Sequence, residues 1–387
     1  MGRRANGKGT LFKRKDGRWS AQVYVTLSNG TTKRVCITSR SRDVVSEKLR
    51  EALEQKRRHI PYVEKEWTIS EYLDYWMKDV QANRIRETTI ASYDVLIEKH
   101  IKPALGGHLL KGLCVQDVRC AMDELHKQGR SGRTRRECLR VLSACFNCAM
   151  REELIFRNVA QLVEKPKYVT KPTVIWTADQ AAHFLESIKN HPQYVAFLLF
   201  LTYGMRRGEV LGLRYCDVDL ENGLIYVRQQ IDRINGKLKA RDLKTVNSRR
   251  TLPAMESVRK AIVEHAAKNS ATIPSFNPHI EESTEGTIIV SRAGTPLEPR
   301  RLGRCFEKMI ENTGLPRITL HAMRHTAATN LKDLGVPVKD AQLILGHSDI
   351  ATTLNIYQHG TFETHRTAIA AVEERLLQKG SVMTIGV

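Results

Sequence analysis

The sequence of 387 residues, long enough for two or three domains, lacks a hydrophobic run that could cross a membrane. Its most apolar stretch, Val195 to Met205, is shorter than the roughly 20 residues that a membrane helix needs. The start, MGRRANGKGT, has no apolar signal-peptide core. Apolar residues at 41% and charged residues at 27% are ordinary globular usage, which excludes wholesale disorder. We therefore expect a cytoplasmic protein.

Signatures of disulfide frames, metal sites and nucleotide-binding loops are also missing. The 8 cysteines are scattered, which favours reduced thiols. Cys145 and Cys148 form a C-x-x-C pair, but no second pair with zinc-ligand spacing accompanies them, and both fit one amphipathic helix as small core residues. The sequence has no carboxylate pair with metal-site spacing and no Walker loop. It therefore implies no metal, no ATP and no other cofactor.

Acidic residues are too few to balance the basic ones. There are 62 Lys and Arg residues against 42 Asp and Glu residues, a net charge of +20. This excess predicts a polyanionic partner. A membrane surface is the less favoured one, because no basic amphipathic helix free of acidic residues is evident. Residues 1–62 alone have 16 basic and 5 acidic side chains, so this segment is expected to bind nucleic acid.

The basic N-terminal segment has the pattern of a small sheet backed by a helix. Residues 18–27 alternate, with the apolar side chains of Trp19, Ala21, Val23 and Val25 on one face. Turn signals bracket this run between two other strand-like runs, and a helical pattern follows from Arg42 to Arg58. We predict an arm-type DNA-binding domain over 1–62, with a three-stranded sheet narrow enough for the major groove. The predicted phosphate contacts are Arg18, Lys33 and Arg34; a solvated basic face is the alternative.

The next segment, 63–165, is helical in pattern throughout, with Gly and Pro breaks that predict a small helical bundle. A basic cluster opens one of its helices, where it could hold phosphates or simply be solvated. The cluster consists of Arg130, Arg133, Arg135, Arg136 and Arg140. Glu164 to Pro172 has prolines, lysines and no apolar period, which is typical of a linker. Residues 172–387 would form the last domain.

Four segments of the last domain combine Arg, Lys, His and Tyr. They are TYGMRRGEVLGLRYCDVDL, LKTVNSRRTLP, LHAMRHTAATNL and LGHSDIATTLNIYQH. An isolated H-x-x-R is weak evidence, since 13 His residues give about one by chance. As an ordered set, the segments resemble the tyrosine recombinases, or phage-integrase family, over about 172–387. The resemblance implies a multi-domain, mainly α protein whose catalytic domain is mixed α/β, preceded by arm-binding and core-binding domains.

The resemblance also assigns site residues. The catalytic set falls on Arg206, Lys244, His321, Arg324, His347 and Tyr357, with Glu209 as the carboxylate that supports Arg206. In the family the Lys protonates the leaving 5′ hydroxyl. Lys239 or Lys237, near a hairpin turn at Asn235-Gly236, could be the acid instead. Departures from the family pattern, at Ala322, Met323 and Val159, touch no reacting group.

The chemistry calls for these residue types independently of the family. Cleaving a phosphodiester without metal requires a nucleophile, a clamp for charge on the nonbridging oxygens, and an acid. A phenol with a pKa near 10 is only about a thousandth ionised at pH 7, so Tyr357 needs a base, for which His321 is suited. Two Arg forks match the two free oxygens, and His347 can donate a further hydrogen bond.

The family resemblance implies a site-specific recombinase that integrates and excises a phage or conjugative transposon. Its partners would be double-stranded DNA attachment sites, a homo-tetramer on DNA, and accessory directionality and DNA-bending proteins. The alternatives are a Xer-like resolving recombinase, a type IB topoisomerase and a catalytically silent DNA-binding protein. A helical pattern from Thr367 to Gln378 would dock on a neighbouring subunit or on its own domain.

Overall fold

The computed structural model describes residues 9–26, 31–58, 66–168, 173–243, 248–274 and 281–357, with 366, 369–370 and 373–374. It divides into two compact units, 1–170 and 171–387, each described here by itself. Among the described helices, none combines the length and apolarity needed to cross a membrane. Lys244 and most of the expected tail helix lie outside the described residues.

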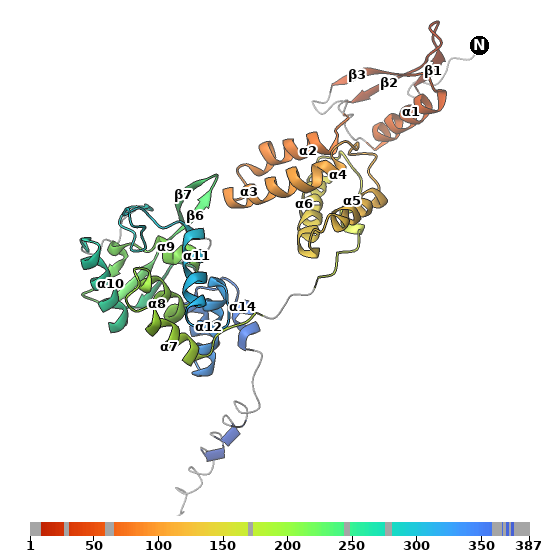
Figure 1. Cartoon of the computed structure of the whole chain (residues 1–387). Helices are drawn as coiled ribbons and strands as arrows, with labels where there is room; N and C mark the ends of the chain where they lie inside the picture. Colours follow the sequence, from red (N-terminus) through yellow and green to blue (C-terminus); the bar gives the residue numbers. More distant parts are fainter. Residues whose placement is uncertain are drawn as a thin grey trace, which may run out of the picture. The chain divides into compact units, whose positions relative to one another are not determined.

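The first unit begins with an antiparallel sheet in the order β1-β2-β3, with α1 against one face (Figure 1). The elements are β1 (Thr10–Lys13), β2 (Trp19–Thr26), β3 (Thr32–Ser39) and α1 (Arg42–Arg57). Alternate β2 residues Ala21, Val23 and Val25 are buried, and Ala52 of α1 lies in the same core. The predicted sheet-plus-helix is confirmed, because the period of two puts the apolar residues on the face that the helix covers.

The rest of this unit is helical, as predicted. Its elements are α2 (Ile69–Tyr75), the π-helical η1 (Trp76–Gln81), α3 (Glu87–Leu96), the π-helical η2 (Ile97–Ile101), α4 (Lys102–Leu105), α5 (Val115–Lys127), α6 (Gly132–Arg151) and the 3₁₀ turn η3 (Val159–Leu162). Thr68 caps α2 through a reciprocal pair of bonds with Glu71, the capping box that starts a helix. Cys145 and Cys148 on α6 are buried core residues with free thiols.

The second unit combines helices with two small antiparallel sheets. Its helices are α7 (Ala178–Ser187), α8 (Tyr194–Tyr203), α9 (Arg207–Gly212), the 3₁₀ turn η4 (Tyr215–Asp217), α10 (Glu256–Lys268), α11 (Pro299–Glu311), α12 (Leu320–Asp333), α13 (Val338–Leu345) and α14 (Ile350–Tyr357). Its strands are β4 (Val218–Asp219), β5 (Leu224–Val227), β6 (Gln229–Ile234), β7 (Lys237–Asp242) and β8 (Arg250–Pro253), ordered β4-β5-β8 and β6-β7. The mixed, mostly helical fold is therefore confirmed.

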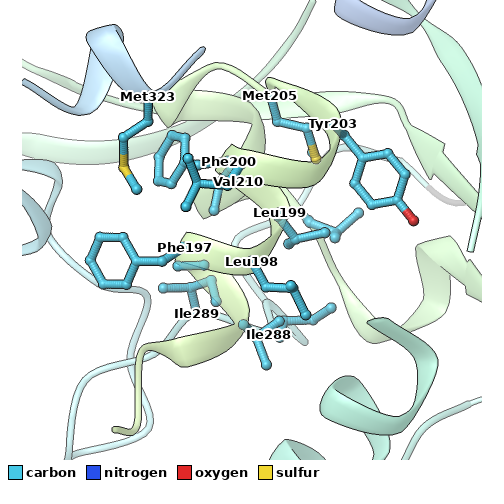
Figure 2. Packing of buried hydrophobic residues seen from close by; sticks show 14 of the residues in the cluster. Phe197, Leu198, Leu199, Phe200, Tyr203, Met205, Val210, Ile288, Ile289 and Met323 are labelled. Atoms are coloured by element: carbon cyan, nitrogen blue, oxygen red, sulfur yellow. The ribbon is translucent and has the colours of Figure 1, made fainter. Parts of the chain in front are cut away.

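The centre of this unit is α8, whose run VAFLLFL is buried on all sides. A helix that is apolar all round belongs in the interior of a large core. In Figure 2, its Phe197 and Phe200 lie beside Met323 of α12, and Ile288 and Ile289 lie near Leu198. Because α8 leads directly into the Arg206 segment and packs on α12, the core fixes the positions of two predicted site elements.

Candidate active site

Arg206 is placed by a turn that only glycine fits. The chain leaves α8 through Gly204 in the left-handed region at φ 61°, and a Cβ there would lie 2.4 Å from Cδ2 of Leu345. Arg206 then caps α9. Its backbone N–H donates to Oε2 of Glu209 at 2.9 Å, and its Nη1 donates to Oε1 at 2.7 Å. The ion pair expected between these two residues is therefore present.

Glu209 is a buried carboxylate shared by two arginines. Its side chain is 1% exposed, and Nη2 of Arg250 donates to Oε2 at 2.9 Å. Burial raises the pKa of Glu209, but Arg250 and Arg206 outweigh it and hold the pKa below its ordinary value. The carboxylate stays ionised and fixes both guanidinium groups.

Arg250, at the start of β8, was not among the predicted site residues. Its Nε donates to the carbonyl of Ile344 at 2.8 Å, so it also holds the turn that follows α13. The only signal in the sequence was its place in the segment NSRRTLP, where Arg249 is an equally good candidate. The structure separates them: Arg250 is 6% exposed, whereas Arg249 is 55% exposed.

Arg324 of α12 is buried with part of its guanidinium group unpaired. Its Nη1 donates to the carbonyl of Gly204 at 2.6 Å, while its buried Nη2 has no hydrogen-bond partner among the described residues. Burial and the nearby charge of Arg206 lower the pKa of Arg324 to about 9, against the opposing pull of Glu209. It remains charged at pH 7, and an anion that accepted from Nη2 would relieve this cost.

His347 follows a second left-handed glycine, Gly346 at φ 67°. The carbonyl of Gly346 accepts from Nη2 of Arg206 at 2.6 Å. The imidazole is buried, and its Nδ1 lies 2.8 Å from Oγ1 of Thr353. Burial, followed by Arg324 and Arg206, lowers the pKa of His347 to about 4, so the ring is neutral at pH 7. A neutral ring offers one donor and one acceptor.

His321 lies on the exposed side of α12, one turn before His325. The two rings meet edge to face, with centroids 4.9 Å apart. Partial desolvation, His325 and Arg324 lower the pKa of His321, so its neutral form prevails at pH 7. A neutral imidazole beside two arginines can accept a proton from a phenol. His325 was present in the quoted motif but was given no role.

Tyr357, the expected nucleophile, lies at the end of α14. Its hydroxyl is buried and has no hydrogen-bond partner within the described parts of the chain. Burial and the negative charge of Asp333 raise the pKa of Tyr357. The charge of Arg206 contributes to the lowered pKa values of Arg324, His321 and His347. The pKa of Tyr357 is raised in part by the carboxylate of Asp333. The structure thus brings together two arginines and two histidines of the predicted set and leaves the phenol outside their hydrogen bonds.

The candidates for the general acid are only partly described. Lys244 lies outside the described residues. Lys237 and Lys239 are exposed on β7, in the hairpin that extends from the body of the unit (Figure 1). Lys239 lies opposite Asp232 of β6. All three lysines stay candidates.

The predicted DNA contacts of the sheet domain are exposed. Arg18, Lys33 and Arg34 all face solvent at least in part, and Arg34 donates to Oε1 of Gln22 on the uncovered sheet face. On that face Tyr24 is 57% exposed. An aromatic ring beside an Arg–amide pair can contact bases as well as phosphates.

The basic cluster at the start of α6 divides into two kinds of side chain. Arg130 and Arg133 are exposed. Arg135 is partly buried, and Nε of Arg136 donates to the carbonyl of Pro166 at 2.6 Å while its guanidinium lies 4.7 Å from the Tyr168 ring. The first two are therefore better placed for phosphates than the second two.

Comparison with known proteins identifies the family of the chain. A family model described as the phage integrase family matches residues 175–364, and one described as the phage integrase N-terminal SAM-like domain matches residues 68–126. The chain belongs to the phage integrase family. As a member of it, the protein is a tyrosine-type site-specific recombinase.

The recombinase is similar to proteins of mobile elements and of the Xer group. It is 26% identical to the transposase from transposon Tn1545 of Streptococcus agalactiae, over 94% of this chain and 95% of the relative. It is also 26% identical to a XerC-like tyrosine recombinase of Caldanaerobacter subterraneus, over 89% and 93%. A structure of the Tn1549 transposon integrase in complex with circular intermediate DNA matches with a TM-score of 0.68 and 26% identity, covering 79% of this chain and 99% of that one.

Proposed function

We propose that this recombinase cleaves a DNA strand by attack of Tyr357 on a phosphate held by Arg206 and Arg324. The observation that carries the proposal is the buried, unpaired Nη2 of Arg324 in a cluster that contains three arginines and one carboxylate. Such a cluster has more positive charge than its own residues neutralise. A phosphodiester with growing negative charge in the transition state supplies the missing partner.

The step balances without a cofactor. The phenolic oxygen of Tyr357 forms a bond to phosphorus, its proton passes to His321, and the bond to the 5′ oxygen breaks. The leaving oxygen takes a proton from a lysine, which we assign to Lys244, with Lys239 and Lys237 as alternatives. His347 donates a hydrogen bond to the phosphate. The phosphotyrosyl ester retains the energy of the cleaved phosphodiester bond. The 5′ hydroxyl of a second strand can therefore attack this ester, which releases Tyr357 and joins the two strands.

The phenol of Tyr357 is not hydrogen-bonded to the arginines or histidines of the site within the described residues. Its surroundings raise its pKa, while Arg206 donates to Glu209 and Nη1 of Arg324 donates to the carbonyl of Gly204, which leaves only Nη2 of Arg324 unpaired. We infer that DNA binding, or contact with another protomer, carries α14 to a position where the phenol reaches the phosphate.

The biological role that we propose is integration and excision of a mobile element, in which the recombinase acts on the nucleoid. The transposon relatives share nearly the whole length of the chain, including its basic sheet domain. In our proposal that domain binds arm-type sites through Arg18, Lys33 and Arg34, and α6 binds core DNA through Arg130 and Arg133, with Arg135 and Arg136 at its edge. In this proposal the three domains span residues 1–62, 63–165 and 172–387.

The number of DNA strands that are cut determines the oligomeric state that we propose. Each tyrosine can hold one strand end, so exchange of both strands between two duplexes needs a tetramer of this chain. Directionality and DNA-bending proteins are further proposed partners. Because the chain is similar to the XerC-like relative, a resolving recombinase is the second candidate function.

The decisive experiment is covalent trapping on a nicked half-site taken from the ends of the element that carries the gene. We expect the wild-type chain to form a 3′-linked adduct that protease digests. Tyr357→Phe should lose the adduct entirely while retaining DNA binding in a mobility-shift assay, because one hydroxyl contributes little to a contact with many phosphates. An adduct formed by the Phe variant refutes the nucleophile. Binding without an adduct in the wild-type chain indicates a silent DNA-binding protein.

A further inference from the structure

Thr353 is a buried hydroxyl in direct contact with the site, and no motif assigned it a role. It lies on α14, is 0% exposed, and its Oγ1 is 2.8 Å from Nδ1 of His347. Within the described parts of the chain its hydroxyl has no other hydrogen bond, although Thr326 on α12 donates to the carbonyl four residues earlier, the usual arrangement in a helix.

The hydrogen bond between these two residues can run in either direction. If Thr353 donates to Nδ1, the ring proton lies on Nε2. If Nδ1–H donates to Thr353, the hydroxyl proton needs a second acceptor, and the described residues provide none. Leaving a buried donor unpaired costs about 1–3 kcal/mol. The first direction is therefore favoured, because it places the ring proton on Nε2, which is not among the buried polar atoms that lack a partner in the described residues, whereas Thr353 is fully buried.

The backbone around the ring keeps it in place for either direction. The N–H of His347 donates to the carbonyl of Gln342 at 3.1 Å, and Nε2 of Gln342 donates to the carbonyl of His347 at 3.0 Å. Neither bond involves the imidazole. Among the described residues, Thr353 is the only hydrogen-bond partner of the ring, so it alone decides which nitrogen holds the proton.

We propose that Thr353 is a positioning residue that holds His347 in the Nε2–H form, so that the neutral ring donates to a nonbridging oxygen of the scissile phosphate. The hydrogen bond to the phosphate in this inference rests on the proposed function, whereas the tautomer of His347 does not depend on it. The low pKa of His347 supports it, because a ring that is neutral at pH 7 has a single N–H and its direction matters.

The position of Thr353 also links the histidine to the nucleophile. Thr353 and Tyr357 lie one helical turn apart on α14. A hydrogen bond from this helix to His347 therefore ties the phosphate donor to the helix that carries the nucleophile. Movement of α14 that kept the Thr353–His347 bond would have to carry the ring with it.

The direct test is the ¹⁵N spectrum of the full-length wild-type chain with labelled histidine, in which His347→Gln identifies the resonance. We expect a neutral ring protonated at Nε2. Thr353→Val, which keeps the shape and removes the hydroxyl, should leave Nδ1 as an acceptor without a donor and move its ¹⁵N resonance to that of a nitrogen without a hydrogen bond. Thr353→Ser should retain the wild-type signal. A wild-type ring protonated at Nδ1 overturns the proposal.

The kinetic test uses single-turnover adduct formation on the nicked half-site. We expect Thr353→Val to slow cleavage by about 10- to 100-fold, the usual effect of losing a group that orients a site residue, and Thr353→Ser to recover most of it. In a His347→Trp background, whose indole N–H has no tautomer, Thr353→Val should have little effect. An equal loss in both backgrounds would mean that Thr353 acts only through packing.

The two tests separate this inference from the proposed function. If the wild-type chain forms no adduct, the proposed function fails while the spectrum still decides the tautomer. If the adduct forms and the ring is protonated at Nδ1, only the role of Thr353 is lost.

Discussion

The arginine cluster (Arg206, Arg250 and Arg324) and α14, which carries Tyr357, belong to the same unit but differ in how fully their polar groups are hydrogen-bonded. Arg206, Arg250 and Arg324 donate to a buried carboxylate and to four backbone carbonyls, those of Gly204, Ser248, Ile344 and Gly346. The hydroxyl of Tyr357 has no partner among the described residues. The group that must stabilise charge is thus preorganised, whereas the group that must form and break a bond is not.

This difference follows from what each group does in the reaction. A charge clamp is most effective when its dipoles need no reorganisation at the moment of reaction. A nucleophile that is cleaved from DNA again at the end of each exchange must be able to enter and leave the site. A phenol with a raised pKa is also a weaker nucleophile, so it is less able to attack a wrong phosphate.

The largest expected effect comes from Arg324→Met, which removes the unpaired cation. Single-turnover cleavage should fall by about 100- to 1000-fold, the range for loss of one charge-stabilising donor. The stability of the fold should rise or stay unchanged, because the lowered pKa of Arg324 shows that its charged form is disfavoured in the folded protein. Hydrogen exchange of α12 in the full-length chain measures this.

Arg250→Met is the matched control for that variant. It removes a buried arginine of the same cluster, but one that is paired with Glu209. Its removal leaves Glu209 with Arg206 alone and deprives the carbonyl of Ile344 of its donor, so the loss should approach the cost of a broken buried pair, about 3–5 kcal/mol. Faster exchange for Arg250→Met but not for Arg324→Met would support the contrast between a structural and a ligand-directed arginine. Equal destabilisation by both would remove it.

The sequence predicted the parts of the molecule that depend on local pattern. The period of two in β2 and the apolar run of α8 are read from neighbouring residues, and the fold followed them. The pairing of Arg206 with Glu209 was accessible too, since both lie on one helical turn. Arg250 and Thr353 were missed because their partners lie more than 40 residues away or across a turn whose geometry the sequence does not specify. The unpaired hydroxyl of Tyr357 could not be predicted, because it depends on how α14 packs and not on a local pattern.

A smaller effect is expected from Gly346→Ala, which tests how tightly the cluster holds the His347 turn. A Cβ at Gly346 would lie 2.7 Å from Nη1 of Arg250, in addition to the cost of a left-handed backbone. Gly335→Ala is the matched control, since Gly335 has φ 72° and open space around it. Both variants should lose about 1–2 kcal/mol of stability from the backbone.

Only the Gly346 variant should also slow cleavage, by about tenfold, because a displaced Arg250 disturbs Glu209 and His347 together. Urea unfolding and single-turnover rates of the full-length chains provide the two measurements. Equal rates for the two variants would show that the turn tolerates displacement and that the cluster is less rigid than its hydrogen bonds imply.

The smallest expected effect is on the pH dependence of cleavage. The lowered pKa of His321 means that the base is already neutral below its ordinary value of 6.5. A base is active in its deprotonated form, so the rate should be level from about pH 6.5 to 8 and fall only on the acid side of that range. His325→Gln removes one of the positive neighbours that lower this pKa, so the acid limb should move to higher pH with the plateau rate nearly unchanged. A limb that stays in place would show that a group other than His321 accepts the proton of Tyr357.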